Sequence, residues 1–333
     1  MWARMSEKSE LHKFIFDGLP VRGQLVRLTD AWQEVLQRRA ANTQTGPWPQ
    51  PVAALLGEMT AAAALMQAGI KFDGALVLQM MGDGPVKLAV AEVQSAASSD
   101  QPDLRLRATA NVAGDVAADA TLADMVNVHG KGRCAITLDA RGRLPGQQPY
   151  QGIVPLAGAP DVAAALTHYM RQSEQLDTTL VLAADERVAA GLLIQRLPVQ
   201  GQANLSQSHV AREDAGKAEE DDYHRISLLA QSLKRQELLT LGAEDILHRL
   251  FWQERVLRFE PQAARFACSC SRERVAAMIA GLGQPEAEDI LREQGQIEVG
   301  CDFCGRQYRF DAVDAARIFT PPAQQPQAPQ GLQ

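Results

Sequence analysis

Four of the five cysteines lie in two short clusters near the C-terminal end of the chain. The first cluster is CSC at 268–270 and the second is CDFC at 301–304. Two such clusters can supply four thiolates to one tetrahedral ion, and structural zinc sites are often all-cysteine. An iron–sulfur site is the alternative that the spacing leaves open. We expect one Zn²⁺ per chain, bound by Cys268, Cys270, Cys301 and Cys304.

The same thiolates are the form of cysteine that oxidants attack. Two disulfides would consume all four ligands, and neighbouring sulfurs within each cluster are the natural partners. The surrounding segment is small, and a structural zinc contributes ~10–16 kcal/mol, as much as the ~5–15 kcal/mol stability of an ordinary domain. Loss of the metal should therefore unfold the segment.

The elements around the cysteines predict a small zinc-binding module over residues 256–319. An extended segment leads into the first cluster, and Ser271 is placed to cap a helix that ends at Gly281. A second short helix covers 285–294. Gly305 follows the second cluster, where glycine permits a tight turn under a metal.

Residues 1–197 predict an α+β core domain that is rich in strands. The segment 51–67 is apolar on nearly every helical face, so we expect it to be a buried helix. The apolar runs 74–81 and 86–93 flank Gly-Asp-Gly-Pro at 82–85, which indicates a hairpin turn. A phosphate loop is the weaker interpretation, because no Lys-Ser/Thr and no helix follow it.

Residues 198–255 predict a linker that is polar at first and then helical. Apolar residues recur there at helical spacing in two stripes, and each stripe must pack on something. Residues 320–333 are rich in Pro and Gln, a composition typical of disordered tails. The first of the two apolar stripes contains Ile226, Leu229 and Leu233, and the second contains Ile246, Leu247 and Leu250.

Composition restricts the function class. The formal net charge of −7 argues against a general nucleic-acid binder. No run reaches the roughly 18 apolar residues of a membrane helix, and no signal peptide is visible, so we expect a cytoplasmic protein. The six histidines are scattered without metal-pair spacing, and Cys134 lies alone in a predicted strand, where a core position is the expected role and a reactive thiol the alternative.

The cysteine motifs, CSCSRER at 268–274 and CDFCG at 301–305, resemble those of the heat shock protein 33 family, which are redox-regulated holdase chaperones. The resemblance covers roughly residues 11 to 319. Further motifs match in the expected order: Val21-Arg22-Gly23, Lys71-Phe72-Asp73-Gly74, Gly82-Asp83-Gly84-Pro85 and Gln172-Ser173-Glu174-Gln175-Leu176.

The resemblance implies an ATP-independent chaperone that is no enzyme and has no catalytic residues. In such a protein the reduced, zinc-bound monomer is inactive. Oxidation would pair Cys268 with Cys270 and Cys301 with Cys304, release zinc and unfold the module and linker. The oxidised protein would dimerise and hold unfolding client proteins under oxidative stress, and the two linker stripes would gain a second role as client or dimer surface.

Two other classes compete with a chaperone. A thiol–disulfide oxidoreductase would use Cys301 and Cys304, but the sequence lacks the strand–CxxC–helix context of such enzymes. A zinc-ribbon nucleic-acid adaptor would use the arginines of the module, although the acidic chain weakens that interpretation. Those arginines are Arg265, Arg272, Arg274, Arg306 and Arg309.

Overall fold

The computed structural model describes residues 8–42, 45–70, 72–95, 103–142, 147–197 and 209–320, with the side chains of 209–219 excepted. The polar start of the predicted linker and the Pro/Gln-rich tail lie outside the described residues. Contacts divide the chain into an N-terminal unit, Met1–Ala267, and a C-terminal unit, Cys268–Gln333. The predicted fold class is confirmed: a sheet-rich α+β core with a buried helix, a helical linker and a small cysteine-bearing module.

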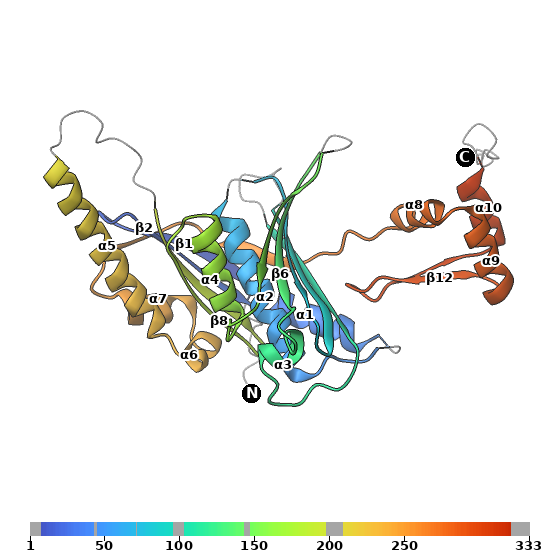
Figure 1. Ribbon diagram of the computed structural model, residues 1–333, viewed down its shortest axis with the longest axis horizontal. Helices are drawn as coiled ribbons and strands as arrows, with labels where there is room; N and C mark the ends of the chain where they lie inside the picture. The colour runs from blue at the N-terminus through green and yellow to red at the C-terminus, as the bar shows by residue number, and fades with distance from the viewer. Residues whose placement is uncertain are drawn as a thin grey trace, which may run out of the picture. The chain divides into compact units, whose positions relative to one another are not determined.

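An eleven-stranded curled sheet forms the frame of the N-terminal unit (Figure 1). Its order is β7-β6-β3-β4-β5-β11-β1-β2-β9-β8, and β10 pairs with β1 beside β11. The expected hairpin at 82–85 is present, because β3 and β4 pair antiparallel around it. The strands are β1 Glu10–Phe16, β2 Val21–Leu28, β3 Gly74–Met81, β4 Val86–Ser95, β5 Leu104–Val112, β6 Arg133–Ala140, β7 Tyr150–Pro155, β8 Thr178–Ala184, β9 Ala189–Arg196, β10 Val256–Arg258 and β11 Gln262–Phe266.

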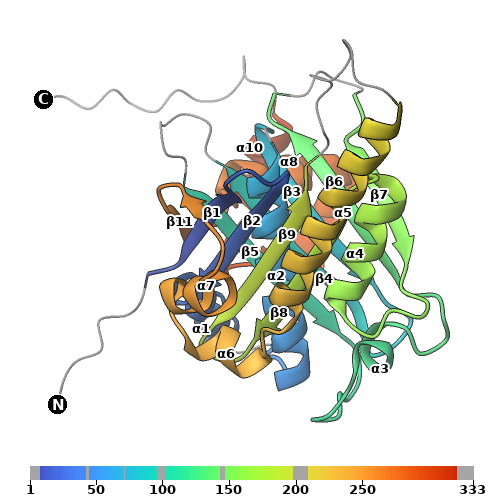
Figure 2. The ribbon, with the colours of Figure 1, turned by 90° about the vertical axis from the view of Figure 1, so that its left-hand side faces the viewer.

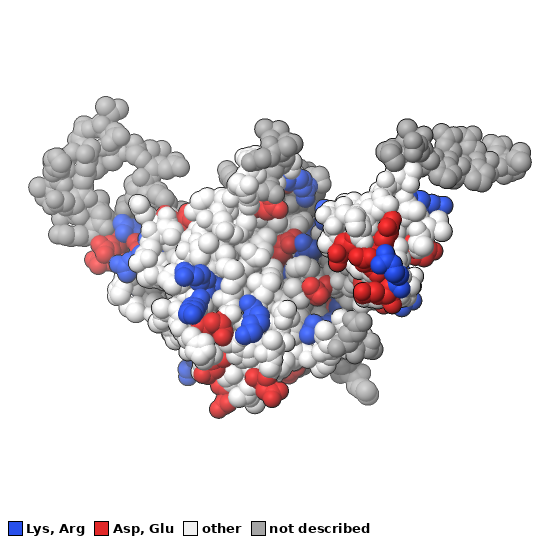
Figure 3. All heavy atoms as spheres, turned by 45° about the vertical axis from the view of Figure 1, so that its right-hand side comes forward, with Lys and Arg blue, Asp and Glu red and all other residues white. Residues whose placement is uncertain are grey.

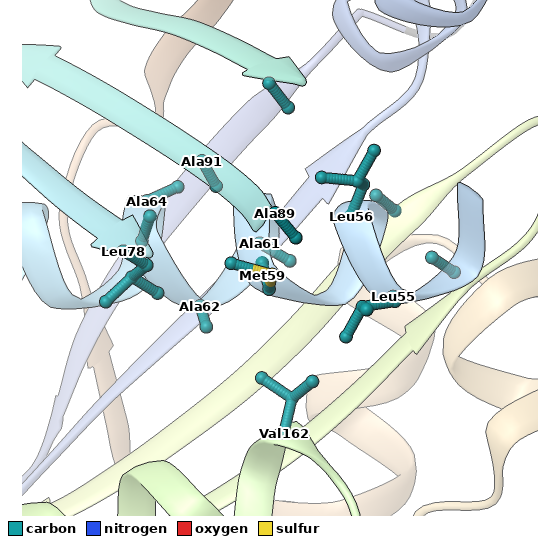
Figure 4. Close-up of a cluster of buried hydrophobic side chains, with 14 of the residues drawn as sticks. Leu55, Leu56, Met59, Ala61, Ala62, Ala64, Leu78, Ala89, Ala91 and Val162 are labelled. Atoms are coloured by element: carbon teal, nitrogen blue, oxygen red, sulfur yellow. The ribbon is translucent and has the colours of Figure 1, made fainter. Parts of the chain in front are cut away.

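Helix α2 (Gln50–Gly69) is the predicted buried helix. Figure 4 shows it between Ala89 and Ala91 of β4 on one side and Val162 on the other. Its alanines let the strands approach closely, while Leu56 and Met59 fill the larger gaps and are fully buried. The helix is long and apolar enough to cross a membrane, but 67% of that window is buried inside the unit, as in a core helix. The helices beside it are α1 Asp30–Ala40, α3 Leu122–Val126 and α4 Val162–Ser173.

The linker helices are α5 (His209–Gln231), α6 (Arg235–Thr240) and α7 (Ala243–Phe251). Figure 2 shows them on the outside of β1, β2, β9 and β8, whose other face carries α2. These strands are therefore apolar on both faces: Val26 of β2 packs with the α2 core, whereas Leu25 packs with the linker helices.

The boundary between the N-terminal and C-terminal units lies later in the chain than the sequence suggests. The expected module begins at 256, but β10 pairs with β1, and β11 pairs with both β1 and β5. Residues 256–266 thus belong to the sheet of the N-terminal unit. The division of the chain into core, linker and switch module as working parts stays a prediction.

The C-terminal unit contains α8 (Arg272–Leu282), α9 (Gln284–Gln294), the hairpin of β12 (Ile297–Gly300) and β13 (Gln307–Phe310), and α10 (Ala312–Phe319). Helix α8 passes through Gly281, so the expected end at this glycine is wrong. The chain turns instead at Gly283, whose φ of +92° favours glycine. Six side chains form the buried core of its described part: Ile279, Ala287, Ile297, Tyr308, Phe310 and Ala315.

Candidate metal centre

The structure brings the four clustered cysteines together. Their Sγ atoms all lie within 4.8 Å of one another. The Sγ atoms of Cys268 and Cys301 are 3.6 Å apart, and those of Cys270 and Cys304 are 3.4 Å apart. Each sulfur thus has a close neighbour from the other cluster, so one site is formed from two segments that are distant in sequence.

Local backbone geometry positions both clusters. Ser271 caps α8 by accepting a hydrogen bond from the Arg274 N–H, so the helix begins directly after the first cysteine cluster. Strand β12 delivers Cys301, whose N–H donates to the Arg306 carbonyl at 2.9 Å, and the Gly305 N–H donates to the Cys301 carbonyl at 2.8 Å. Gly305 has φ of +71°, so the expected glycine turn is confirmed.

Backbone N–H groups surround the second cluster. Those of Phe303 and Cys304 donate toward the Cys301 sulfur, and that of Arg306 donates toward the Cys304 sulfur, which favours the thiolates. The hydrogen bond with Cys268 nevertheless raises the pKa of Cys301, and burial raises the pKa of Cys304. Four thiolates at these distances need a compensating cation, and a bound metal deprotonates its thiols outright.

The donor set fits a tetrahedral ion such as Zn²⁺. Zn–S bonds of ~2.3 Å place the sulfurs of a regular tetrahedron about 3.8 Å apart, close to the two short contacts observed. The Tyr308 hydroxyl donates to the Cys270 sulfur at 3.1 Å, an outer contact of the kind that orients metal ligands.

Four of the five arginines considered for nucleic-acid binding make contacts that serve the fold. Arg272 stacks 4.2 Å from the Phe310 ring and pairs with Asp314 at 2.7 Å. Arg274 donates to the Ser269 carbonyl, Arg309 pairs with Glu298, and Arg265 lies on β11 beside Asp103. Acidic and basic side chains are interspersed on the face that Figure 3 shows. Phosphate-binding proteins instead cluster their basic side chains.

The linker stripes pack on the sheet. Ile226 and Ile246 are fully buried, Leu233, Leu247 and Leu250 are nearly so, and Leu229 is partly buried. The residues that they cover, on the strands and just before β9, were not found by sequence reasoning. We call them the covered face: Phe14, Phe16, Val21, Leu25, Ala183, Val188, Ala190, Leu192 and Ile194.

Contacts of two arginines also hold α6 to α2 and to the sheet, and no sequence signal indicated them. Arg235 of α6 pairs with the carboxylate of Glu58 on α2 at 3.0 Å and donates to the Ala184 carbonyl. The buried Arg27 of β2 donates to the Leu238 carbonyl, which lies in the last turn of α6. Undocking the linker would therefore strip buried charged groups of their partners, which is costly.

Cys134 belongs to the N-terminal unit, whereas the four clustered cysteines belong to the C-terminal unit. Its side chain is fully buried on β6, and burial raises the pKa of its thiol to about 12. A thiol that stays protonated in an apolar core is chemically inert, which agrees with the expected core position.

Comparison with known proteins places the chain in a family. The Hsp33 protein family model matches residues 9–311. The 33 kDa chaperonins of Chromobacterium violaceum and Methylobacillus flagellatus are 45% and 42% identical, each over 95% of this chain and over 95% and 96% of their own length. The crystal structure of the 33 kDa chaperonin (heat shock protein 33 homolog) of Thermotoga maritima shares the fold, with a TM-score of 0.68 at 20% identity over 93% of this chain and 97% of that one. The chain belongs to the Hsp33 protein family.

Proposed function

We propose that this protein is a redox-regulated, ATP-independent holdase chaperone whose reduced, zinc-bound form is inactive. The observation that carries the proposal is the convergence of four sulfurs, within 4.8 Å, in a unit with a core of only six described side chains. Relatives that match nearly the whole chain are named chaperonins, which supports a non-enzymatic, client-binding role. A unit this small depends on its metal, so chemistry at the sulfurs becomes a folding event.

The proposed switch is a four-electron oxidation. Each disulfide forms when two thiolates give up two electrons, and one hydrogen peroxide takes those electrons with two protons to become two waters. Two disulfides leave no thiolate for Zn²⁺, which is released. The C-terminal unit then unfolds, because its small core cannot offset the conformational entropy of the chain.

We propose the pairs Cys268–Cys270 and Cys301–Cys304. In the reduced site two close sulfur–sulfur contacts run between the clusters instead, from Cys268 to Cys301 at 3.6 Å and from Cys270 to Cys304 at 3.4 Å. Oxidation of the first thiolate weakens the metal site and loosens the unit before both disulfides are complete, so distances in the folded site do not decide the pairing. In an unfolding chain only sequence neighbours stay close, because closing a small loop costs the least entropy.

Unfolding would pass to the linker and uncover apolar surface. Seventeen side chains are buried between the linker helices and the covered face. Releasing the helices would expose both partners, so each stripe would become client or dimer surface. Exposed patches of this extent are typical of protein–protein interaction sites. The partners are then unfolding client proteins and, after oxidation, a second copy of the chain, all in the cytoplasm.

An oxidoreductase is the weaker candidate. Cys301 and Cys304 lie in a turn between β12 and β13, so no helix begins at this CxxC. The N-terminus of a helix is what lowers the pKa of the attacking thiol in such enzymes, and here the pKa values of both cysteines are raised.

An aggregation assay tests the proposal. A thermally unfolding client is followed by light scattering with reduced protein and with protein oxidised by peroxide under mild heat. We expect suppression by the oxidised form alone in the unchanged protein and in the control Cys134→Ala. Cys268→Ser/Cys301→Ser, which removes two of the four clustered sulfurs, should instead suppress aggregation without any oxidant. If the oxidised protein leaves the client to aggregate as fast as buffer does, the proposal is wrong. Turnover in an insulin-reduction assay would favour the oxidoreductase.

A further inference from the structure

The N-terminal unit contains a cavity of about 310 Å³ that the chaperone proposal does not use. It lies where α2 and α4 end, between the inner sides of the two ends of the curled sheet. Its walls are mostly aliphatic, with Leu65 and Met66 of α2, Leu76 of β3 and Met170 of α4 among them. A cavity of this volume with apolar walls and few polar groups is typical of small-molecule sites.

One wall carries a buried amide without a partner. Gln24 of β2 is 3% exposed, and within the described residues its side chain makes no hydrogen bond; its Oε1 is fully buried. Buried polar groups without a partner are rare, because each costs about 1–3 kcal/mol. Rotating the amide exchanges its oxygen and nitrogen, so the group can either accept from or donate to a molecule in the cavity.

Beside Gln24 lies a cation that no carboxylate neutralises within the described part of the chain. Arg22 donates to the Gln195 Oε1 at 3.0 Å and to the carbonyl of Gly69, the last residue of α2, at 3.0 Å. Both acceptors are neutral, and the helix end offers only about half a negative charge. Burial lowers the pKa of Arg22, which reflects a half-buried charge that would gain from an anion.

The opposite rim repels an anion and therefore orients one. The Glu174 carboxylate accepts hydrogen bonds from the hydroxyls of Tyr169 at 2.6 Å and Tyr150 at 3.1 Å, so it already has hydrogen-bond donors within the protein. Tyr150 is 53% exposed and marks the side that is open to solvent. An anionic head group is thus favoured only at the Arg22 end.

We propose that this cavity binds a small amphipathic anion, an alkyl chain that ends in a carboxylate. The carboxylate accepts hydrogen bonds from Arg22 and from the Gln24 amide, and the chain lies against the leucine and methionine side chains of α2, β3 and α4. Binding needs neither oxidation nor the cysteines, so the proposal stands apart from the chaperone proposal.

Methionine-methyl NMR of the reduced, zinc-loaded chain tests the site with decanoate below its micellar concentration. We expect saturable shifts of the Met66 and Met170 methyl signals, assigned with Met→Leu variants. Met278, which lies exposed on α8, serves as the internal control and should not move. Decanol should bind on the order of tenfold or more weakly, because it loses the charge-assisted hydrogen bonds.

Variants test the head-group contact. Arg22→Gln and Gln24→Leu should each weaken decanoate while leaving decanol nearly unchanged, and Arg187→Gln, whose side chain is 64% exposed, is the matched control. If either variant fails to fold, the comparison of decanoate with decanol on the unchanged chain tests the proposal. The proposal is overturned if decanoate gives no saturable shift at Met66 and Met170, or if decanol binds as tightly.

Discussion

Phe251 of α7 lies at the centre of the contact between the linker and the covered face. It is 2% exposed, and its ring centroid lies 5.0 Å from that of Phe16, edge to face, and 6.1 Å from that of Phe14. Truncating a buried phenylalanine to alanine costs ~3–5 kcal/mol, as lost transfer energy and as a cavity that its neighbours fill only partly. All of this cost acts on the docked linker, since the undocked helix exposes residue 251 in either form.

A loss of about 4 kcal/mol lowers the ratio of docked to undocked linker by roughly a thousandfold. If docking is what keeps the reduced protein inactive, Phe251→Ala should suppress client aggregation without any oxidant and with zinc still bound. Trp252→Ala is the matched control, because this neighbouring side chain is 67% exposed and its removal should change nothing.

The assay combines light scattering of the client, hydrogen exchange of α5–α7, and zinc content under reducing conditions. Faster exchange in the linker, retained zinc and aggregation suppression would agree with the reasoning. Faster exchange without any suppression would refute it, because the covered face would then be exposed and still not bind clients.

Three further predictions follow from individual residues. Gly305→Ala should cost on the order of 1–2 kcal/mol, because the φ of Gly305 is +71°, and should lower both the zinc affinity and the melting temperature of the C-terminal unit. Gly281→Ala should instead raise that melting temperature, because Gly281 lies on α8 with open space around it. Equal effects of the two substitutions would refute the argument that Gly305 is needed for the turn. Burial raises the pKa of Glu58 despite its pairing with Arg235, so the folded state binds this proton more tightly than the unfolded state. The stability of the protein should therefore fall as the pH rises from about 4.5 through the raised pKa. The urea midpoint should depend less on pH in Glu58→Gln than in the exposed control Glu186→Gln, and equal pH dependence in the two variants would contradict the assignment. Cys134 should resist alkylation at pH 8 in the native protein while the four module cysteines react once a chelator removes the metal, as mass spectrometry would show; rapid labelling of Cys134 would contradict its burial.

The sequence predicts well those features that depend on neighbouring residues. The β3–β4 hairpin follows from Gly-Asp-Gly-Pro between apolar runs, and the buried α2 follows from a helix that is apolar on every face. The two cysteine clusters predict one site because four metal ligands must converge. In each instance the signal lies within a short stretch or in a fixed chemical requirement.

Features set by distant partners escaped prediction. Strands β1 and β2 are packed on both faces, so they lack the alternation by which half-buried strands are recognised. Strands β10 and β11 extend toward the cysteines along the chain, yet their hydrogen bonds go to β1 and β5, far away in sequence. The cavity beside Gln24 likewise depends on where α2 and α4 end against the sheet.

Oxidative control of the metal site is tested by counting zinc and free thiols in one sample during oxidation, with the disulfides mapped by mass spectrometry. One zinc should leave per chain as four thiols disappear, Cys134 should stay reduced, and the bonds should join Cys268 to Cys270 and Cys301 to Cys304. Aggregation suppression should rise in step with zinc release. Full suppression while zinc and all four thiolates remain in place would contradict control of the chaperone by oxidation of the metal site.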